Sequence, residues 1–146
     1  MRRISAAIEI DAPPERVWEV LVDFPAYSQW NPFMREVRGR AEVGGRLRIR
    51  MRRKGGRWLS FGARITAADP PRELAWEGVG LRGHWPGLVR GERRIRIEPR
   101  PGGTSRVEMH TTFTGLLSAA MGWLDAYRPS FEQMERALKE RAERPP

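Results

Sequence analysis

The sequence contains no cysteine, so disulfide bonds and thiolate metal sites are excluded. It also has no apolar run of the roughly 18 residues that a membrane-spanning helix needs. The N-terminus carries Arg2 and Arg3, but Glu9 and Asp11 interrupt it before the apolar core of a signal peptide can develop. These absences lead us to expect a cytoplasmic protein.

Lysine is nearly absent as well, because Lys54 and Lys139 are the only ones, yet the net charge is +9. Arginine therefore supplies almost all of the positive charge. A basic chain invites nucleic-acid or anionic-membrane partners, but a general preference for arginine over lysine explains the same composition. The chain has 146 residues, of which 40% are hydrophobic and six are tryptophan. This composition predicts a single folded domain over residues 1–146.

Hydrophobic periodicity divides the chain into strands and helices. Apolar residues alternate over 4–10, which predicts a half-buried strand. Residues 11–24 begin with an acid and two prolines and continue at helical spacing, so we expect a helix that Pro25 ends and a short helical piece over 27–32. Six strand candidates follow, separated by short glycine and proline turns that favour an antiparallel meander. They are 33–39, 46–52, 58–67, 72–77, 88–98 and 104–114.

The period changes in the last segment, where apolar residues recur every three or four positions from Leu117 to Leu138. This spacing predicts an amphipathic helix of more than about twenty residues, with a kink at Pro129. The order of elements is one strand, two short helices, about six strands and a long helix. It predicts an α+β helix-grip fold, in which a curved antiparallel sheet of about seven strands wraps around the long C-terminal helix.

Four segments of the chain have a recognisable pattern. They are 10–24 (IDAPPERVWEVLVDF), 27–32 (YSQWNP), 112–117 (TFTGLL) and 131–140. These segments resemble the START-like (SRPBCC) superfamily, the polyketide cyclase/dehydrase and lipid-transport group, over nearly the whole chain. The resemblance implies a cavity between sheet and helix but no particular reaction. Related bacterial sequences often have Gly-Glu-His where this chain has Gly91-Glu92-Arg93, so a role that depends on that histidine does not carry over.

Strand alternation predicts which side chains face this cavity. Counting in twos from the apolar residues of their strands places Arg93 and Thr111 on the inner face. An inward arginine needs a partner, which is a ligand carboxylate or phosphate, Asp125 of the C-terminal helix, or solvent at the cavity mouth. The predicted ligand-binding residues are Trp30, Phe33, Phe61, Trp76, Arg93, Thr111, Phe113, Met121 and Leu124, and the predicted cavity rim is Tyr27, His84 and Trp85. The alternative is that the inner face is only a packed core.

Motifs for catalysis are missing: there is no nucleophile motif, phosphate-binding loop or pair of catalytic carboxylates. We therefore expect the chain to bind or carry a small hydrophobic molecule, lipid-like or polycyclic, without a cofactor. A cyclase- or aromatase-like enzyme is the alternative, because such an enzyme can work mainly by shaping its substrate. We expect no metal site, because His84 and His110 have no clear further ligands.

The outer face of the sheet is rich in arginine by the same alternation. The arginines predicted there are Arg46, Arg48, Arg50, Arg52, Arg64, Arg94, Arg96 and Arg106. Acids are interspersed, so we expect a solvated, partly balanced face that makes at most weak contact with anionic membranes and no specific contact with nucleic acid. The alternative is an electrostatic platform for nucleic acid or anionic lipid, with Trp58 as the one candidate for stacking on a base.

Overall fold

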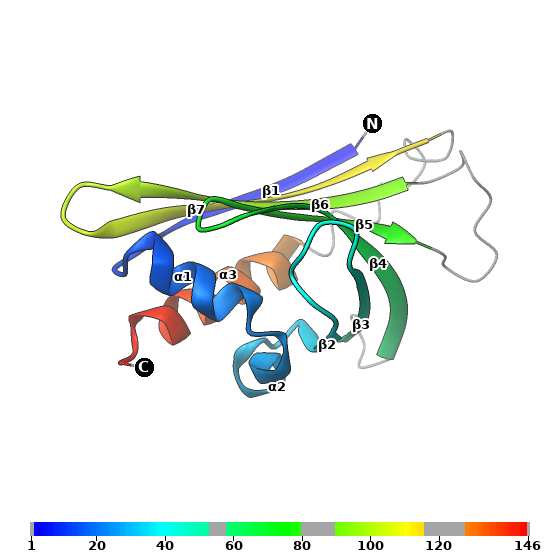
Figure 1. Ribbon diagram of the computed structural model, residues 1–146, viewed down its shortest axis with the longest axis horizontal. Coiled ribbons are helices and arrows are strands. Elements are labelled where there is room, and N and C mark those ends of the chain that lie inside the picture. Colours follow the sequence, from blue (N-terminus) through cyan, green and yellow to red (C-terminus); the bar gives the residue numbers. More distant parts are fainter. Residues whose placement is uncertain (1, 53–57, 80–89, 116–127, 146) are drawn as a thin grey trace.

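Seven antiparallel strands form one curved sheet in the order β1-β7-β6-β5-β4-β3-β2 (Figure 1). The computed structural model describes residues 2–52, 58–79, 90–115 and 128–145. The strands are β1 (Arg2–Ile10), β2 (Met34–Arg38), β3 (Arg46–Arg52), β4 (Trp58–Asp69), β5 (Glu73–Val79), β6 (Arg90–Arg100) and β7 (Thr104–Thr114). The helices are α1 (Pro14–Val22), the short 3₁₀ helix η1 (Phe24–Ala26), α2 (Tyr27–Trp30) and α3 (Arg128–Glu143). The predicted helix-grip fold is confirmed, with strand ends that differ from the prediction by a few residues.

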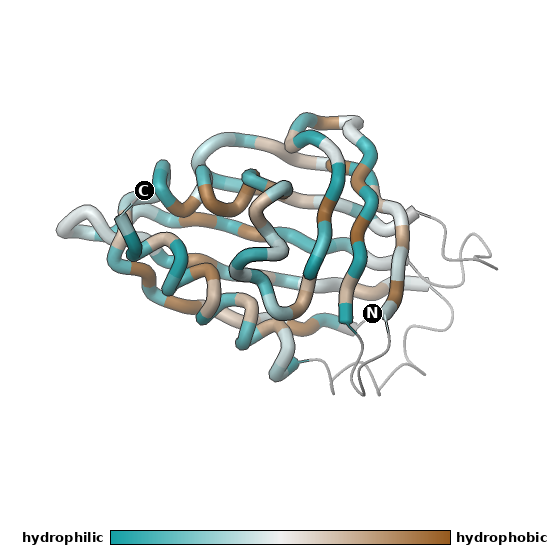
Figure 2. The backbone as a smooth tube through the Cα atoms, turned by 90° about the horizontal axis from the view of Figure 1, so that it is seen from below, coloured by the Kyte–Doolittle hydropathy of each residue, from teal (hydrophilic) through white to brown (hydrophobic). Residues whose placement is uncertain are grey.

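The curvature of the sheet gives it an inner and an outer face. Helices α1 and α3 lie on the inner side, and β2, β3 and β4 bend around toward them (Figure 1). Side chains alternate between the two faces, as along β3, where Leu47 and Ile49 are buried while Arg46, Arg48 and Arg50 are exposed. Figure 2 shows the same alternation of hydrophobic and hydrophilic residues along the strands. The buried residues of the inner face and the helices together make one core.

The C-terminal helix α3 packs its apolar side against the sheet. Phe131, Met134, Leu138 and Ala142 are buried along that side, at the spacing of an amphipathic helix. The start that we expected near Leu117 lies outside the described residues, so the predicted kink is not tested. None of the helices among the described residues is long and apolar enough to cross a membrane.

Side chains from α3 also reach β1, which is one of the two edge strands of the sheet. Arg128 Nη1 donates a hydrogen bond to the carbonyl of Ser5, at 3.1 Å. Lys139 Nζ donates to the carbonyl of Glu9, also at 3.1 Å. These two bonds go to backbone carbonyls of a strand that has a neighbouring strand on one side only.

Candidate functional site

The interior of the molecule holds a buried arginine. Arg93 lies on β6, where the register places it opposite Trp76 of β5 and Thr111 of β7, and Thr111 in turn lies opposite Ile4 of β1. These residues form a row across the inner face. Arg93 is only 7% exposed, so the prediction that it points inward is confirmed.

Aromatic rings surround the guanidinium of Arg93. Its central carbon lies 4.6 Å from the ring centre of Phe131, 5.8 Å from that of Phe33 and 5.9 Å from that of Trp76. Phe33 and Phe131 also meet edge to face, with ring centres 5.3 Å apart. Rings at these distances attract a cation through their electron-rich faces, so they partly offset the loss of water around the guanidinium.

Hydrogen bonding of the Arg93 guanidinium is weak. Nη1 points at the sulfur of Met34 at 3.3 Å, and Nη2 at the sulfur of Met109 at 4.0 Å, and thioether sulfur is a poor acceptor. Nε has no hydrogen-bond partner among the described residues. Burial lowers the pKa of Arg93 to about 10, so the side chain stays charged at neutral pH. The site is therefore a buried cation with unused capacity to donate to an anion.

A buried carboxyl group faces the same interior from α3. Glu135 is 3% exposed, and its Oε1 has no hydrogen-bond partner among the described residues. Burial raises the pKa of Glu135 to about 7, and the positive charge of Arg93 limits the rise. Near neutral pH this group therefore exists in both protonation states, which is the condition for a carboxyl group that exchanges a proton.

Glu135 is not among the residues predicted from the sequence, because the prediction for the last helix rests on its apolar residues. The residue lies four positions after Phe131 and three before Leu138, so it is on the buried stripe of α3. An acid on such a stripe is a detectable signal, since buried carboxylates are uncommon without a partner. Asp125, one of the three alternative partners considered for Arg93, lies outside the described residues.

Asn31 is a second residue that the sequence analysis did not assign to the site. Its side-chain oxygen accepts hydrogen bonds from the backbone N–H of Phe33 at 3.0 Å and of Met34 at 2.8 Å. This turn fixes the entry into β2 and thereby positions two residues that contact Arg93. The signal was the Asn31-Pro32 pair, because Asn commonly bonds the backbone two residues on.

Tyr27 is fully buried, so the prediction that it lies at the cavity rim is wrong. Its hydroxyl donates to the carbonyl of Leu21, and its ring packs edge-on against Phe24 and Trp30, with centres 5.5 and 4.9 Å away. Burial raises the pKa of the phenol well above its usual value. The reason for the correction is that α2 folds back on the end of α1, so the tyrosine ties the two helices together.

The remaining predicted ligand-binding residues are placed as follows. Phe33, Trp76 and Arg93 come together as described. Trp30, Phe61 and Phe113 are partly buried and pack against the core, and Thr111 is half-buried beside Arg93. Met121 and Leu124, together with the rim residues His84 and Trp85, lie outside the described residues.

Next to Arg93, the inner face of the sheet is built from small residues. Gly91 precedes Arg93 by two on the same strand, and Gly78 follows Trp76 by two on β5 and pairs with Ala63 of β4. The edge of the Phe113 ring covers Gly91, because a methyl group there would lie 3.3 Å from it. At Gly78 the described atom closest to such a methyl group is a backbone oxygen 3.9 Å away. The inner face therefore has no bulky side chain at these two positions beside the guanidinium, and it has free space at Gly78.

Comparisons to known proteins agree with this fold. The family model for polyketide cyclase / dehydrase and lipid transport proteins matches residues 1–143. The chain belongs to this family. The resemblance of residues 10–24 and 27–32 to the START-like group is thereby confirmed. No curated protein matches the sequence.

Solved structures of the polyketide cyclase and START groups have the same fold. The Zhui aromatase/cyclase from Streptomyces sp. R1128 superposes with a TM-score of 0.78 at 19% identity, covering 98% of this chain and 94% of that one. A START superfamily protein from Mycobacterium smegmatis gives 0.73 at 19% identity, covering 97% of both chains. The di-domain aromatase/cyclase BexL of the BE-7585A biosynthetic pathway gives 0.73 at 19% identity over 99% of this chain, which spans 51% of BexL. At these identities the likeness establishes the fold.

Proposed function

We propose that this protein binds a small hydrophobic molecule carrying an acidic group, between the inner face of the sheet and the C-terminal helix. The observation that carries the proposal is Arg93, a buried guanidinium whose Nε has no partner among the described residues. Transferring an unpaired charge from water into an apolar interior costs several kcal/mol, about what a bound carboxylate or phosphate would recover. Membership of a family of cyclases and lipid carriers supports an apolar ligand body.

The aromatic residues around Arg93 suit the rest of such a ligand. Phe33, Trp76 and Phe131 offer ring faces and edges to an apolar body, and ligand sites typically combine such surface with a few polar groups. The space at Gly78, where the described atom closest to an added methyl group is 3.9 Å away, would give the ligand room beside its anchor. Guanidinium groups grip carboxylates and phosphates with two parallel hydrogen bonds, so Arg93 would also fix the orientation of the ligand.

Two probes that differ only in the acid test the role of Arg93. The fluorescent lipid cis-parinaric acid and its methyl ester share one apolar body, and we expect the protein to bind the acid about tenfold or more tightly than the ester. Arg93→Met keeps a similar volume without the charge, so the two probes should bind it alike. Arg94→Met is the matched control, because Arg94 points outward on the same strand, and it should retain the preference.

Equal binding of both probes by the unmodified protein would contradict the anchor role of Arg93. Loss of the preference in both variants would contradict it too. Native mass spectrometry of protein purified under mild conditions extends the test to ligands of any shape. If native mass spectrometry detects no bound small molecule and neither probe binds, the result would count against ligand binding altogether.

Glu135 favours a second candidate function, an enzyme that cyclises or dehydrates its substrate. A carboxyl group with a pKa of about 7 near a buried guanidinium has the properties of a general acid or base, with the cation stabilising an enolate oxygen. The test is turnover of a synthetic poly-β-ketone thioester, followed by the absorbance of its aromatic product. Catalysis through Glu135 predicts a rate that changes near pH 7 and is lost in Glu135→Gln. A rate equal to that of Glu135→Gln would leave binding as the function.

A further inference from the structure

The outer side of β2, β3 and β4 is strongly basic, and we call it the arginine face. Its members are Arg38, Arg46, Arg48, Arg50, Arg52 and Arg64, all of them exposed. Glu36 pairs with Arg38 at 2.8 Å. Within the described ranges, the other members form no ion pair, and the outward acids of the next strand begin with Glu77, opposite Arg64. The arginine face therefore has a large uncompensated positive charge.

The register of the strands places like charges opposite each other on this face. Arg46 of β3 is paired with Arg64 of β4, and Arg48 of β3 with Arg38 of β2. Like charges directly opposite on neighbouring antiparallel strands repel and destabilise the sheet. An anionic surface laid over the arginines would screen this repulsion, so the face is suited to such a partner.

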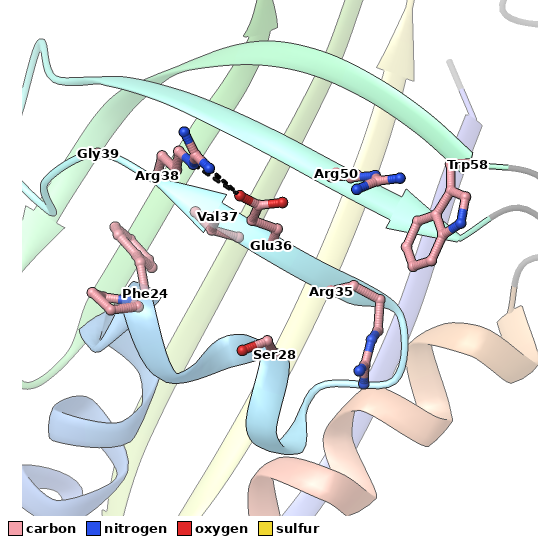
Figure 3. A pocket seen from close by; sticks show the side chains of 10 residues that line it. Phe24, Ser28, Arg35, Glu36, Val37, Arg38, Gly39, Arg50 and Trp58 are labelled. Carbon is pink, nitrogen blue, oxygen red and sulfur yellow. Dashed lines mark hydrogen bonds and ion pairs between the residues drawn. The ribbon is translucent and has the colours of Figure 1, made fainter.

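The arginine face also has hollows in which an anionic group can sit. Gly62 lies opposite Arg48 and has no side chain, and a cavity of about 650 Å³ opens there, lined by Arg38, Arg46, Arg48 and Arg64. A second hollow of about 630 Å³ lies beside it, between β2 and the η1–α2 segment (Figure 3). Arg50 and Trp58 close one end of this second hollow, with Arg38 and Glu36 nearer the other (Figure 3).

Exposed hydrophobic residues lie at both ends of β3. Val43, in the turn before the strand, is 68% exposed, and Trp58, opposite Arg52 at its far end, is 45% exposed. They are the exposed large hydrophobic residues of the described part of the chain. The guanidinium carbons of Arg50 and Arg52 lie 4.5 and 5.7 Å from the Trp58 ring. Tryptophan beside arginine is typical of the boundary between lipid head groups and acyl chains.

We propose that the arginine face docks on an anionic phospholipid bilayer. The arginines meet the lipid phosphates, and Val43 and Trp58 enter the interfacial layer at the two ends of the contact. A nucleic acid would meet the same charges, but it would leave Val43 exposed to water and offer Trp58 no apolar layer. The combination of charge with exposed apolar side chains therefore favours the bilayer.

This docking is independent of the ligand proposed for the interior. Arg48 and Arg93 point to opposite faces of the same sheet, one exposed and the other buried. Changes on the arginine face should leave the binding of cis-parinaric acid unaltered. The two proposals can therefore fail separately.

The experiment is vesicle co-sedimentation at physiological salt, with two variants of equal charge. Vesicles of phosphatidylcholine and phosphatidylglycerol at a ratio of about 7 to 3 supply the anionic surface, and pure phosphatidylcholine is the neutral control. The test variant carries Arg46→Thr, Arg48→Thr and Arg64→Thr. The control variant carries Arg96→Thr, Arg100→Thr and Arg106→Thr, three arginines that pair with glutamates elsewhere on the sheet. Circular dichroism confirms that both fold.

We expect the protein to bind the anionic vesicles and not the neutral ones. Each arginine near an anionic surface strengthens vesicle binding. The loss of three arginines should therefore make the test variant bind the anionic vesicles about a hundredfold more weakly. The affinity of the control variant for the vesicles should fall by less than about tenfold. Trp58→Ser should weaken vesicle binding while leaving any DNA binding unchanged. Absent vesicle binding, or equal losses in both triple variants, would overturn the proposal. Tight binding to duplex DNA without binding to vesicles would overturn it in favour of a nucleic acid.

Discussion

Arg93 and Arg94 are consecutive residues of β6, and they meet opposite environments. Arg94 points outward, where it lies 2.6 Å from Glu73 and 3.0 Å from Glu92, and these partners raise its pKa. Arg93 points inward among aromatic rings and sulfur atoms, and burial lowers its pKa to about 10. The outer arginine is satisfied by its own sheet, whereas the inner one has capacity left over. That difference is the reason why we propose a binding role for Arg93 and a structural role for Arg94.

The largest effect is expected when a second positive charge is placed in the interior beside Arg93. Glu135→Lys would place an ammonium group near Arg93 without water around it, so we expect a loss of about 3–5 kcal/mol in the free energy of unfolding. Urea denaturation followed by tryptophan fluorescence measures this loss. Glu132→Lys makes the same charge change on the exposed side of α3, where Glu132 meets Arg136 at 3.8 Å, and should cost less than about 1 kcal/mol. Equal losses would mean that Glu135 is not in an apolar environment.

A change of pH tests the inner carboxyl group alone. The pKa of Glu135 rises from 4.5 to about 7 on folding, so the folded protein binds the proton more tightly than the unfolded chain. Its contribution to stability is therefore complete below about pH 4.5 and disappears as pH rises through about 7. Glu135→Gln stays neutral, so relative to the unmodified protein its free energy of unfolding should gain on the order of 3 kcal/mol between these limits. A difference between the two proteins that does not vary with pH would contradict the raised pKa.

The smallest expected effect is at Glu73 on the outer face. Its contribution to stability decreases as pH falls, whereas that of Glu135 decreases as pH rises. A hydrogen bond from Arg94, with a second from Arg96, holds the pKa of Glu73 below its usual value. The contribution of Glu73 to stability is therefore present at neutral pH and is lost as pH falls through that lowered pKa. Glu73→Gln should cost about 1 kcal/mol at pH 7, and added salt should reduce this cost because the group is near solvent. Thermal unfolding at low and high salt measures it. A salt-independent cost would indicate a packing role instead.

The alternation of residues predicted much of this arrangement. The two-residue repeat in β6 predicted an inward Arg93 and an outward Arg94, because a strand leaves each residue only two directions. The same repeat predicted that the outer arginines would be partly balanced by acids. This is confirmed on β6 and β7, where Arg94, Arg96 and Arg106 pair with glutamates, whereas the arginines of β3 form no ion pair among the described residues. Which arginine meets which acid depends on the register between strands, and alternation alone does not determine the register.

The parts of the site that come from helices and turns were harder to predict. The burial of Tyr27 depends on how α2 turns back after Pro25. A helix as short as α2 has no periodicity from which this turn could be predicted. Glu135 was overlooked because an acid on an apolar stripe conflicts with the pattern that identifies the stripe. Asn31 acts through a side-chain hydrogen bond to the backbone, which is visible in the sequence only as a turn. The placement of Tyr27 and Glu135 depends on tertiary contacts, whereas that of Asn31 depends on a local turn.

The bonds from α3 to the edge of β1 have a consequence for how the protein behaves at high concentration. A free sheet edge is a template on which an extended segment of another molecule can add as an eighth strand and begin a fibre. Arg128 and Lys139 hold the acceptors at Ser5 and Glu9, so an incoming strand would first have to displace two cations. The helix that closes over the inner face thereby also guards the chain against self-association along its longest exposed edge.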